Sequence, residues 1–289
     1  MATLRRLWTN GAFRYGAGVL GLVFVVACLA PILGTVDPAA MDYNNINRGA
    51  GHVGTFTLID GSQIPHSFWL GSDNFGRDLY SRIIYGARVS LLVAVSTALL
   101  ALLIGSLIGM TAGYFRAADM LLMRVMDGLM AIPAILLAIA LVAALGANIA
   151  TVVVAIAIPE IPRVSRLVRS LVLSLREEPF VEAARALATS PLVILLRHIL
   201  PNAMAPLLVQ GTFVAASAVL LEAILSFLGL GLPAEIPTWG NIMAEGRTQF
   251  SQYPGNVLYP AMVLVPTVLA FNLLGDGLRD VLDPKFAKR

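Results

Sequence analysis

Residues 177–202 read EEPFVEAARALATSPLVILLRHILPN and form a polar, charged segment between two long apolar stretches. Pro179 suits the start of a helix and Pro191 its end, because proline is tolerated in the first turn but not in a helix interior. The small side chains between them would let a short helix lie close to a neighbour's backbone. The segment therefore predicts a helix over residues 182–190 and a second helical stretch over 192–200, which ends at Pro201.

The composition around this segment indicates an integral membrane protein. Hydrophobic residues make up 58% of the chain, against roughly 45–50% in soluble domains. Charged residues make up 13%, about half the usual share, and the mean hydropathy is +0.81. The net charge of +3 does not indicate a nucleic-acid partner, because the cations lie at the ends of apolar runs and not in a patch with aromatic residues. The expected environment is membrane lipid.

Apolar runs of about 20 residues predict an all-α protein with six transmembrane helices. The fourth is the weakest, because Pro159 and Pro162 interrupt its second half. We expect one membrane domain, in which residues 1–70 hold an N-terminal tail, the first span and an outer loop, and residues 71–289 form the transmembrane core. The six predicted spans cover residues 16–36, 89–114, 120–145, 149–168, 203–230 and 257–278.

The positions of arginine and lysine predict the orientation of these spans. With the N-terminus inside, 15 of the 20 Lys and Arg residues fall in cytoplasmic segments, among them Arg116, Arg185, Lys285, Lys288 and Arg289. Cytoplasmic loops carry such an excess of cations in membrane proteins. Both termini are therefore expected inside. The two long outer segments, 37–88 and 231–256, are expected to be loops with ordered parts.

The chain lacks the motifs that carry common chemistry. It contains no G-x-x-x-x-G-K-[ST] phosphate loop, no H-E-x-x-H and no G-x-S-x-G. His52, His66 and His198 lie in three separate segments and form no ligand spacing. We therefore expect no catalytic residues, no metal site and no cofactor bound by this chain.

Two acidic residues inside predicted spans are candidates for a translocation pathway, because a charge buried in lipid costs several kcal/mol. Glu160 lies between two prolines, which free backbone carbonyls that must then line protein or water. We expect Glu160 to face the pathway and to attract cationic groups. Glu222 is placed near the middle of the fifth span, where a structural hydrogen bond is an equal alternative.

Three glycines in the second span predict a close contact between helices. Gly105, Gly109 and Gly113 repeat at four-residue spacing. Such a stripe of small residues lets the backbones of two helices approach closely in a membrane. A glycine-rich helix without a special partner is the alternative interpretation.

The polar segment at residues 177–202 resembles the EAA loop of permease subunits in ATP-binding-cassette importers. That pattern has Glu-Ala-Ala, three residues, a glycine, and later a hydrophobic residue before Leu-Pro. Glu182-Ala183-Ala184 and Ile199-Leu200-Pro201 match it, whereas the glycine is replaced by Ala188. We expect this replacement to let the helix continue slightly further. The residues that would dock on an ATPase subunit are Glu182, Ala183, Ala184, Arg185, Ala186, Leu187, Ala188, Thr189 and Ser190.

The resemblance covers nearly the whole chain and is to the oligopeptide, dipeptide and nickel permease family, in particular to its shorter C-type subunit. The matching segments are HSFWLGSDNFGRD at 66–78, GARVSL at 86–91, LSFLGLG at 225–231, Trp239-Gly240 and FNLLGDGLRDVLDP at 271–284. The resemblance implies a type I importer transmembrane domain in the bacterial inner membrane. It also implies a loop at about 177–201 that couples the permease to its motor.

The same resemblance implies a set of partners. These are a homologous second permease subunit, two ATPase subunits that hold ATP and Mg on the inside, and a solute-binding protein on the outside. Peptide is the expected substrate, with nickel chelates, opines and glutathione as alternatives from the same family.

Physics alone leaves other interpretations open. The helix at 182–190 could lie on the membrane surface, which Arg185 and Arg197 would favour. An ion-coupled secondary transporter is a different class of function; it would need acid relays and usually internal repeats, and no repeat is evident. A passive channel or a membrane scaffold is the third class.

Overall fold

The computed structural model describes residues 2–282 and is helical apart from one hairpin. Some residues used above lie outside the described residues. They are the C-terminal cations Lys285, Lys288 and Arg289 and the last two residues of the C-terminal motif, Asp283 and Pro284. The long helices are α2 (Gly11–Cys28), α3 (Leu79–Tyr114), α4 (Arg116–Met130), α5 (Ala134–Leu145), α6 (Ile149–Leu175), α9 (Leu200–Phe227) and α11 (Gly255–Leu282). The shorter elements are α1 (Ala2–Thr9), α7 (Pro179–Ala186), α8 (Pro191–Val193), the π-helical η3 (Ile194–Ile199) and α10 (Trp239–Gly246), the 3-10 turns η1 (Ala30–Ile32), η2 (Tyr43–Asn45) and η4 (Arg247–Gln249), and the strands β1 (His52–Thr57) and β2 (Gln63–Phe68).

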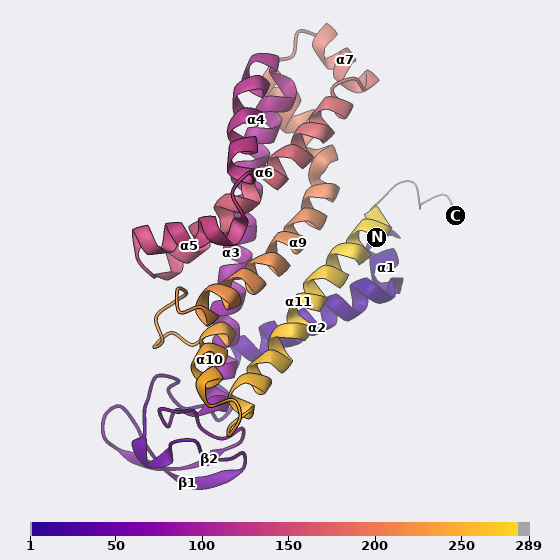
Figure 1. The fold of residues 1–289 in the computed structure, drawn as a ribbon. Coiled ribbons are helices and arrows are strands. Elements are labelled where there is room, and N and C mark those ends of the chain that lie inside the picture. Colours follow the sequence, from indigo (N-terminus) through magenta and orange to yellow (C-terminus); the bar gives the residue numbers. More distant parts are fainter. Residues whose placement is uncertain (1, 283–289) are drawn as a thin grey trace.

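The long helix α3 is the centre of the bundle. It packs along α6 and α9, while α11 packs along α2 and α9. Figure 1 shows the hairpin and α10 at one end of the molecule and α7 at the other. Asn10 Nδ2 donates to Asp280 Oδ2 at 3.3 Å, so α2 begins beside the place where α11 ends. The two described ends of the chain therefore lie together, as expected for termini on one side of a membrane.

The helical membrane fold that the composition predicted is confirmed, but not every predicted span is a regular membrane-crossing helix. Among residues 2–282, four helices are long and apolar enough to cross a membrane: α2, α3, the continuous helix Pro191–Phe227 and α11. The bent pair α4 and α5 makes a fifth crossing if it is counted as one. α6 has the length, but Glu160, Arg163 and Arg166 all fall within its first 18 residues.

Two predicted boundaries are wrong at the outer side. The first span was predicted to continue to residue 36, but α2 ends at Cys28, shortly before Pro31. Proline cannot continue the hydrogen bonding of a helix and disfavours helical geometry in the residue before it. The second span was predicted to begin at residue 89, but α3 begins at Leu79, because the Asp78 side chain accepts a hydrogen bond from the Ser81 N–H at 2.7 Å and caps the helix.

A proline breaks the third span, for which no break was predicted, whereas the prolines of the fourth span do not interrupt its helix. The predicted span 120–145 breaks at Pro133, where α4 and α5 meet at a bend of 88°. In contrast, α6 runs without a break through Pro159 and Pro162 and extends to Leu175. Both α4 and α5 contact α6, so a neighbour on both sides of Pro133 did not prevent the bend, whereas α6 packs mainly along α3 and stays continuous.

The predicted turn at Pro201 is also absent. Instead, α8, η3 and α9 form one continuous helix, Pro191–Phe227, and Pro201 lies inside it without the N–H that would donate to the preceding turn. The π-helical η3 takes up the irregularity instead of a turn.

The long outer segment between α2 and α3 is folded. β1 and β2 pair antiparallel, with His52 opposite Phe68 and Thr57 opposite Gln63. Phe56 and Phe68 are buried in a small core with Val36 and neighbouring residues. The expectation of an ordered outer loop is met by this hairpin, and the division of the chain near residue 70 stays a prediction.

Candidate functional site

The helix α7 stands at the end of the bundle opposite the hairpin, beyond the ends of α4 and α6 (Figure 1). It begins at Pro179 and ends at Ala186, and so lies three to four residues before the range predicted for it. Glu182 lies in its first turn and Arg185 in its last, which complements the helix dipole at both ends.

One side of α7 is buried and the other is exposed. Val181 and Ala184, three residues apart, are buried in the core cluster that includes Ile194, Leu195 and Ile199 of η3. Of the nine residues predicted to dock on a partner, Ala184 therefore faces the protein interior, and Thr189 is half-buried. The exposed members are Glu182, Ala183, Arg185, Ala186, Leu187, Ala188 and Ser190.

The end of α7 differs from the prediction at Ala188. The expected continuation of the helix is wrong, because Ala188 has a φ of +54°, in the left-handed region. Its N–H donates to Arg185 O at 2.9 Å, and the N–H of Thr189 donates to Ala184 O at 3.1 Å. This pair of hydrogen bonds is the Schellman motif, in which glycine is the usual residue at the left-handed position. The geometry that glycine would provide is therefore retained with alanine.

The helix α7 contacts the inner end of α3, and α3 is joined there to the end of α6. The Arg185 guanidinium lies over the Tyr114 ring, with 5.5 Å between Cζ and the ring centroid. Arg176, directly after α6, donates from Nη1 to Gly113 O at 3.2 Å. A displacement of α7 would therefore act on the two helices that form the centre of the bundle.

Apolar side chains add to the exposed surface around α7. Leu187 is 81% exposed and Leu192 is 65% exposed, and Phe180 is also exposed. Clustered apolar exposure at the tip of a chain indicates a contact surface. We call the surface formed by Phe180, Glu182, Leu187 and Leu192 the α7 tip.

The three glycines of the predicted stripe lie against α6. A Cβ atom at Gly105 would lie 2.6 Å from Val164 Cβ, one at Gly109 would lie 2.5 Å from Ser165 O, and one at Gly113 would lie 2.7 Å from Val172 Cβ. These distances leave no room for a larger residue. The backbones of α3 and α6 are therefore in close contact along the inner half of α3.

The two interior acids lie in different surroundings. Glu160 is 2% exposed, and its Oε1 accepts from Arg163 Nη1 at 3.1 Å, while the Arg163 side chain is 54% exposed. Glu222 is fully buried and accepts from Ser226 Oγ at 2.8 Å. It lies one to two turns from the outer end of α9 and not in the middle of that span, so its predicted depth is wrong.

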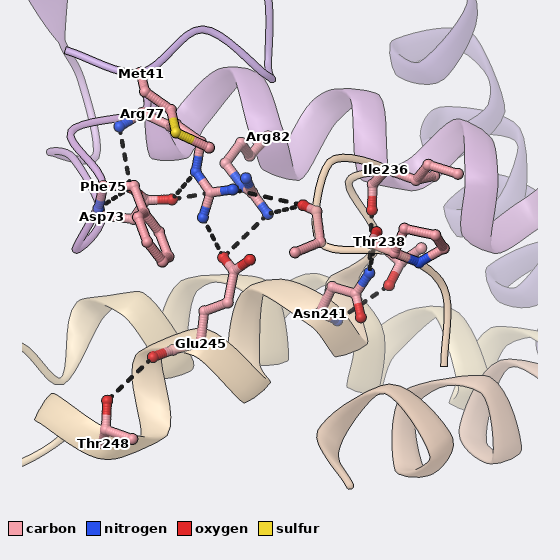
Figure 2. A network of polar contacts seen from close by, with 12 residues as sticks. Met41, Asp73, Phe75, Arg77, Arg82, Ile236, Thr238, Asn241, Glu245 and Thr248 are labelled. Atoms are coloured by element: carbon pink, nitrogen blue, oxygen red, sulfur yellow. Dashed lines mark hydrogen bonds and ion pairs between the residues drawn. The ribbon is translucent and has the colours of Figure 1, made fainter. Parts of the chain in front are cut away.

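A buried cluster of charges at the outer end was not predicted from the sequence. Figure 2 shows Asp73 and Arg77 before α3, Arg82 in its first turns, and Glu245 in α10. Arg77 Nε donates to Asp73 Oδ2 at 2.7 Å, and Arg82 Nη2 donates to Glu245 Oε2 at 3.1 Å. Arg77 also pairs with Glu245. The cluster therefore ties α10 to the beginning of α3.

The electrostatics of this cluster follow from its burial. Both arginine side chains are almost completely buried. Burial raises the pKa of the Glu245 carboxyl above its usual value, although Arg82 and Arg77 act in the opposite direction. The partners are 163 and 168 residues apart in sequence, so no local pattern could reveal them. The available signal was the presence of Asp73, Arg77 and Arg82 directly before an apolar span.

No cluster of three His, Cys, Asp or Glu side chains suited to a metal ion occurs within residues 2–282. That this chain binds no cofactor stays a prediction.

Comparison with known proteins identifies the family. Residues 101–288 match the model of the binding-protein-dependent transport system inner membrane component. The chain is 46% identical over 283 residues to a putative peptide transport system permease protein of Brucella abortus, covering 98% of this chain and 91% of that protein. It is 42% identical over 273 residues to the dipeptide transport system permease protein DppC of Alkalihalophilus pseudofirmus, covering 92% and 85%.

Two further similarities agree with this result. The chain is 42% identical over 266 residues to the glutathione transport system permease protein GsiD of Escherichia coli O6:K15:H31, covering 91% of this chain and 83% of that protein. A chain of the MetNI methionine ABC transporter, solved in inward facing conformations, superposes with a TM-score of 0.57 at 20% identity, covering 70% of this chain and 97% of that one. The second similarity shows the fold alone. This chain is a multi-pass membrane protein and belongs to the family of inner membrane components of binding-protein-dependent transport systems.

Proposed function

We propose that the chain is the permease subunit of an ATP-binding-cassette importer that moves peptides across the inner membrane, and that the α7 tip receives the force of an ATPase subunit. The observation that carries the proposal is the position of α7 at the extreme inner end of the bundle, with Glu182 and Leu187 exposed and with Arg185 of α7 lying over Tyr114 of α3.

The assembly we propose contains two ATPase subunits inside, a homologous second permease subunit beside this chain, and a solute-binding protein outside. ATP and Mg would be held by the ATPase subunits, because this chain contains no phosphate loop. Closure of the ATPases would favour one of two arrangements of the permease through contacts that differ between them. The chain itself would perform no hydrolysis.

The first experiment tests the coupling. The assembled transporter in proteoliposomes, supplied with its binding protein, should take up substrate in an ATP-dependent manner. Glu182→Lys should abolish this uptake while the chain remains in the membrane, because the substitution reverses an exposed charge within the α7 tip. Glu177→Lys, which makes the same charge change at the same end but outside α7, should retain most of the uptake. Uptake that survives Glu182→Lys and follows a proton gradient would identify a secondary transporter instead.

The second experiment addresses the substrate. The relatives are named for peptide, dipeptide and glutathione transport, which supports a peptide. Uptake of a labelled dipeptide should be competed by unlabelled di- and oligopeptides and not by a nickel chelate. Competition by glutathione alone would restrict the substrate to that tripeptide.

We also propose that Glu160 acts in the translocation pathway. Glu160 and Arg163 form a pair in which only the arginine is well exposed, so the arginine competes with any cationic substrate for the carboxylate. Glu160→Gln should change the uptake of cationic peptides relative to neutral ones. Equal uptake of both classes before and after the substitution would remove Glu160 from the pathway. For Glu222, whose hydrogen bond to Ser226 indicates a structural role, Glu222→Gln should leave this ratio unchanged.

A further inference from the structure

A groove of about 580 Å³ opens on the surface of the bundle between α2 and α3, with α11 as its floor. Apolar side chains form its walls, among them Leu20, Phe24, Leu92, Val95 and Phe271. Phe24, Leu92 and Val95 are also exposed on the outer surface of the bundle. The groove is therefore open on the outside of the helix bundle.

The only charged residue that lines the groove is Arg88, which lies at one end of it. Arg88 Nε donates to Ala27 O, and Nη2 donates to Cys28 O at 3.0 Å. These carbonyls belong to the last turn of α2, which leads to the outer hairpin. Arg88 thus marks the outer boundary of the groove.

The length of the groove matches one leaflet. Its deepest residue in α2, Leu20, precedes Cys28 by eight residues, which corresponds to about 12 Å along a helix. One half of a hydrocarbon core of roughly 30 Å is about 15 Å. An acyl chain lying in the groove would therefore end near the bilayer midplane, with its headgroup level with Arg88.

The environment of Arg88 suits a phosphate. The guanidinium lies 5.2 Å from the Tyr85 ring centroid, and a tyrosine at this depth is typical of the interface between membrane and water. Nη1 donates no hydrogen bond to any described residue, so it is available to an acceptor from outside. Basic side chains beside apolar surfaces between membrane helices bind anionic lipid headgroups.

We propose that this groove binds one anionic phospholipid of the outer leaflet, with an acyl chain between α2 and α3 and the phosphate on Arg88. A protein subunit in the same place would have to supply an acceptor for Nη1 of Arg88, because a buried donor without an acceptor is costly.

The experiment measures lipid binding by native mass spectrometry of the purified full-length chain with the subunits that co-purify. The probes are palmitoyl-oleoyl phosphatidylglycerol and palmitoyl-oleoyl glycerol, which has the same acyl chains without the phosphate. The wild-type protein should bind the first more tightly. Arg88→Gln should weaken that binding about tenfold, the size expected from losing one charged hydrogen bond.

A pair of tryptophan substitutions tests the groove without changing the hydrogen bonds that Arg88 donates to the end of α2. Leu92→Trp fills the groove and should also weaken binding of the phosphatidylglycerol. Leu99→Trp, two turns deeper on α3 and also exposed but outside the groove, should leave it unchanged. Equal binding by all four proteins would show nonspecific association and overturn the proposal. Absence of bound lipid from the wild-type assembly would also overturn it and indicate that another subunit covers the groove.

Discussion

The helices α7 and α10 each have eight residues and each connects two long helices, but they lie at opposite ends of the molecule and are held differently. In α7, only Val181 and Ala184 are buried. In α10, five residues are buried, and Trp239 Nε1 donates to Ile83 O of α3 at 3.1 Å. Long-range contacts therefore fix α10 in the bundle, whereas α7 keeps most of its surface free. The difference indicates that the outer end holds the bundle together, and it agrees with the partner contact that we propose for the inner end.

The strongest test of this comparison removes the acid that links α10 to α3. Glu245→Ala would leave the buried Arg77 and Arg82 with Asp73 as the one remaining acid for two positive charges. Breaking a buried ion pair costs about 3–5 kcal/mol, because one of the two charges is then uncompensated. The unfolding temperature of the detergent-solubilised protein should fall markedly, as measured by differential scanning fluorimetry.

Two controls define what this result would mean. Glu235→Ala removes an exposed acid from the loop before α10 and should leave the unfolding temperature unchanged. Glu182→Ala in α7 should also leave it unchanged while reducing transport. If Glu245→Ala unfolds at the wild-type temperature, the outer cluster does not hold α10 and the contrast between the two ends fails.

The second test concerns α3, which contacts α7 at its inner end and α10 at its outer end. Gly109→Ala would place a Cβ atom 2.5 Å from Ser165 O and 2.7 Å from Val168 Cβ, both in α6. Overpacking of this kind typically costs 1–3 kcal/mol. We expect a lower unfolding temperature and weaker coupling of ATP hydrolysis to uptake.

Gly128→Ala is the matched control, since a Cβ atom there would meet nothing within 4 Å. In the interior of α4 this change should stabilise the helix by up to about 1 kcal/mol. If both substitutions shift the unfolding temperature in the same direction, the contact of α3 with α6 is not responsible for the effect.

These contrasts also explain what the sequence could predict. The α7 segment was recognised because its proline, acid and alanines lie within a few residues of each other. The spans were recognised because the length of an apolar run is a local property of the sequence. The outer cluster was missed because Arg77 and Glu245 are 168 residues apart and meet only through packing.

The prolines show a second limit of sequence reasoning. Pro133 breaks a helix and Pro159 does not, although both lie in apolar segments. The prolines of α6 lie directly beside or within residues 161–172, which the glycine stripe brings into close contact with α3. A single span read by itself does not contain this information.

The smallest expected effect concerns the end of α7. Ala188 holds the left-handed position of the Schellman motif, and this conformation costs an L-residue other than glycine roughly 1–2 kcal/mol. Ala188→Gly should therefore stabilise the end of α7 by about 1 kcal/mol. Hydrogen exchange of the Ala188 and Thr189 amides, which donate to Arg185 and Ala184, should slow by a factor of about five.

The same substitution two residues earlier, where the backbone is helical, supplies the control for this prediction. Ala186→Gly places glycine in the last turn of α7 at an exposed position, where it should speed the same exchange by a similar factor. Neither change should alter exchange in α10, because that helix is held by Trp239 and Glu245 through contacts far from α7. Exchange in α10 that follows the changes in α7 would mean that the two ends are thermodynamically coupled in the resting protein. In that case α7 would stabilise the whole bundle and not only the inner end where it lies.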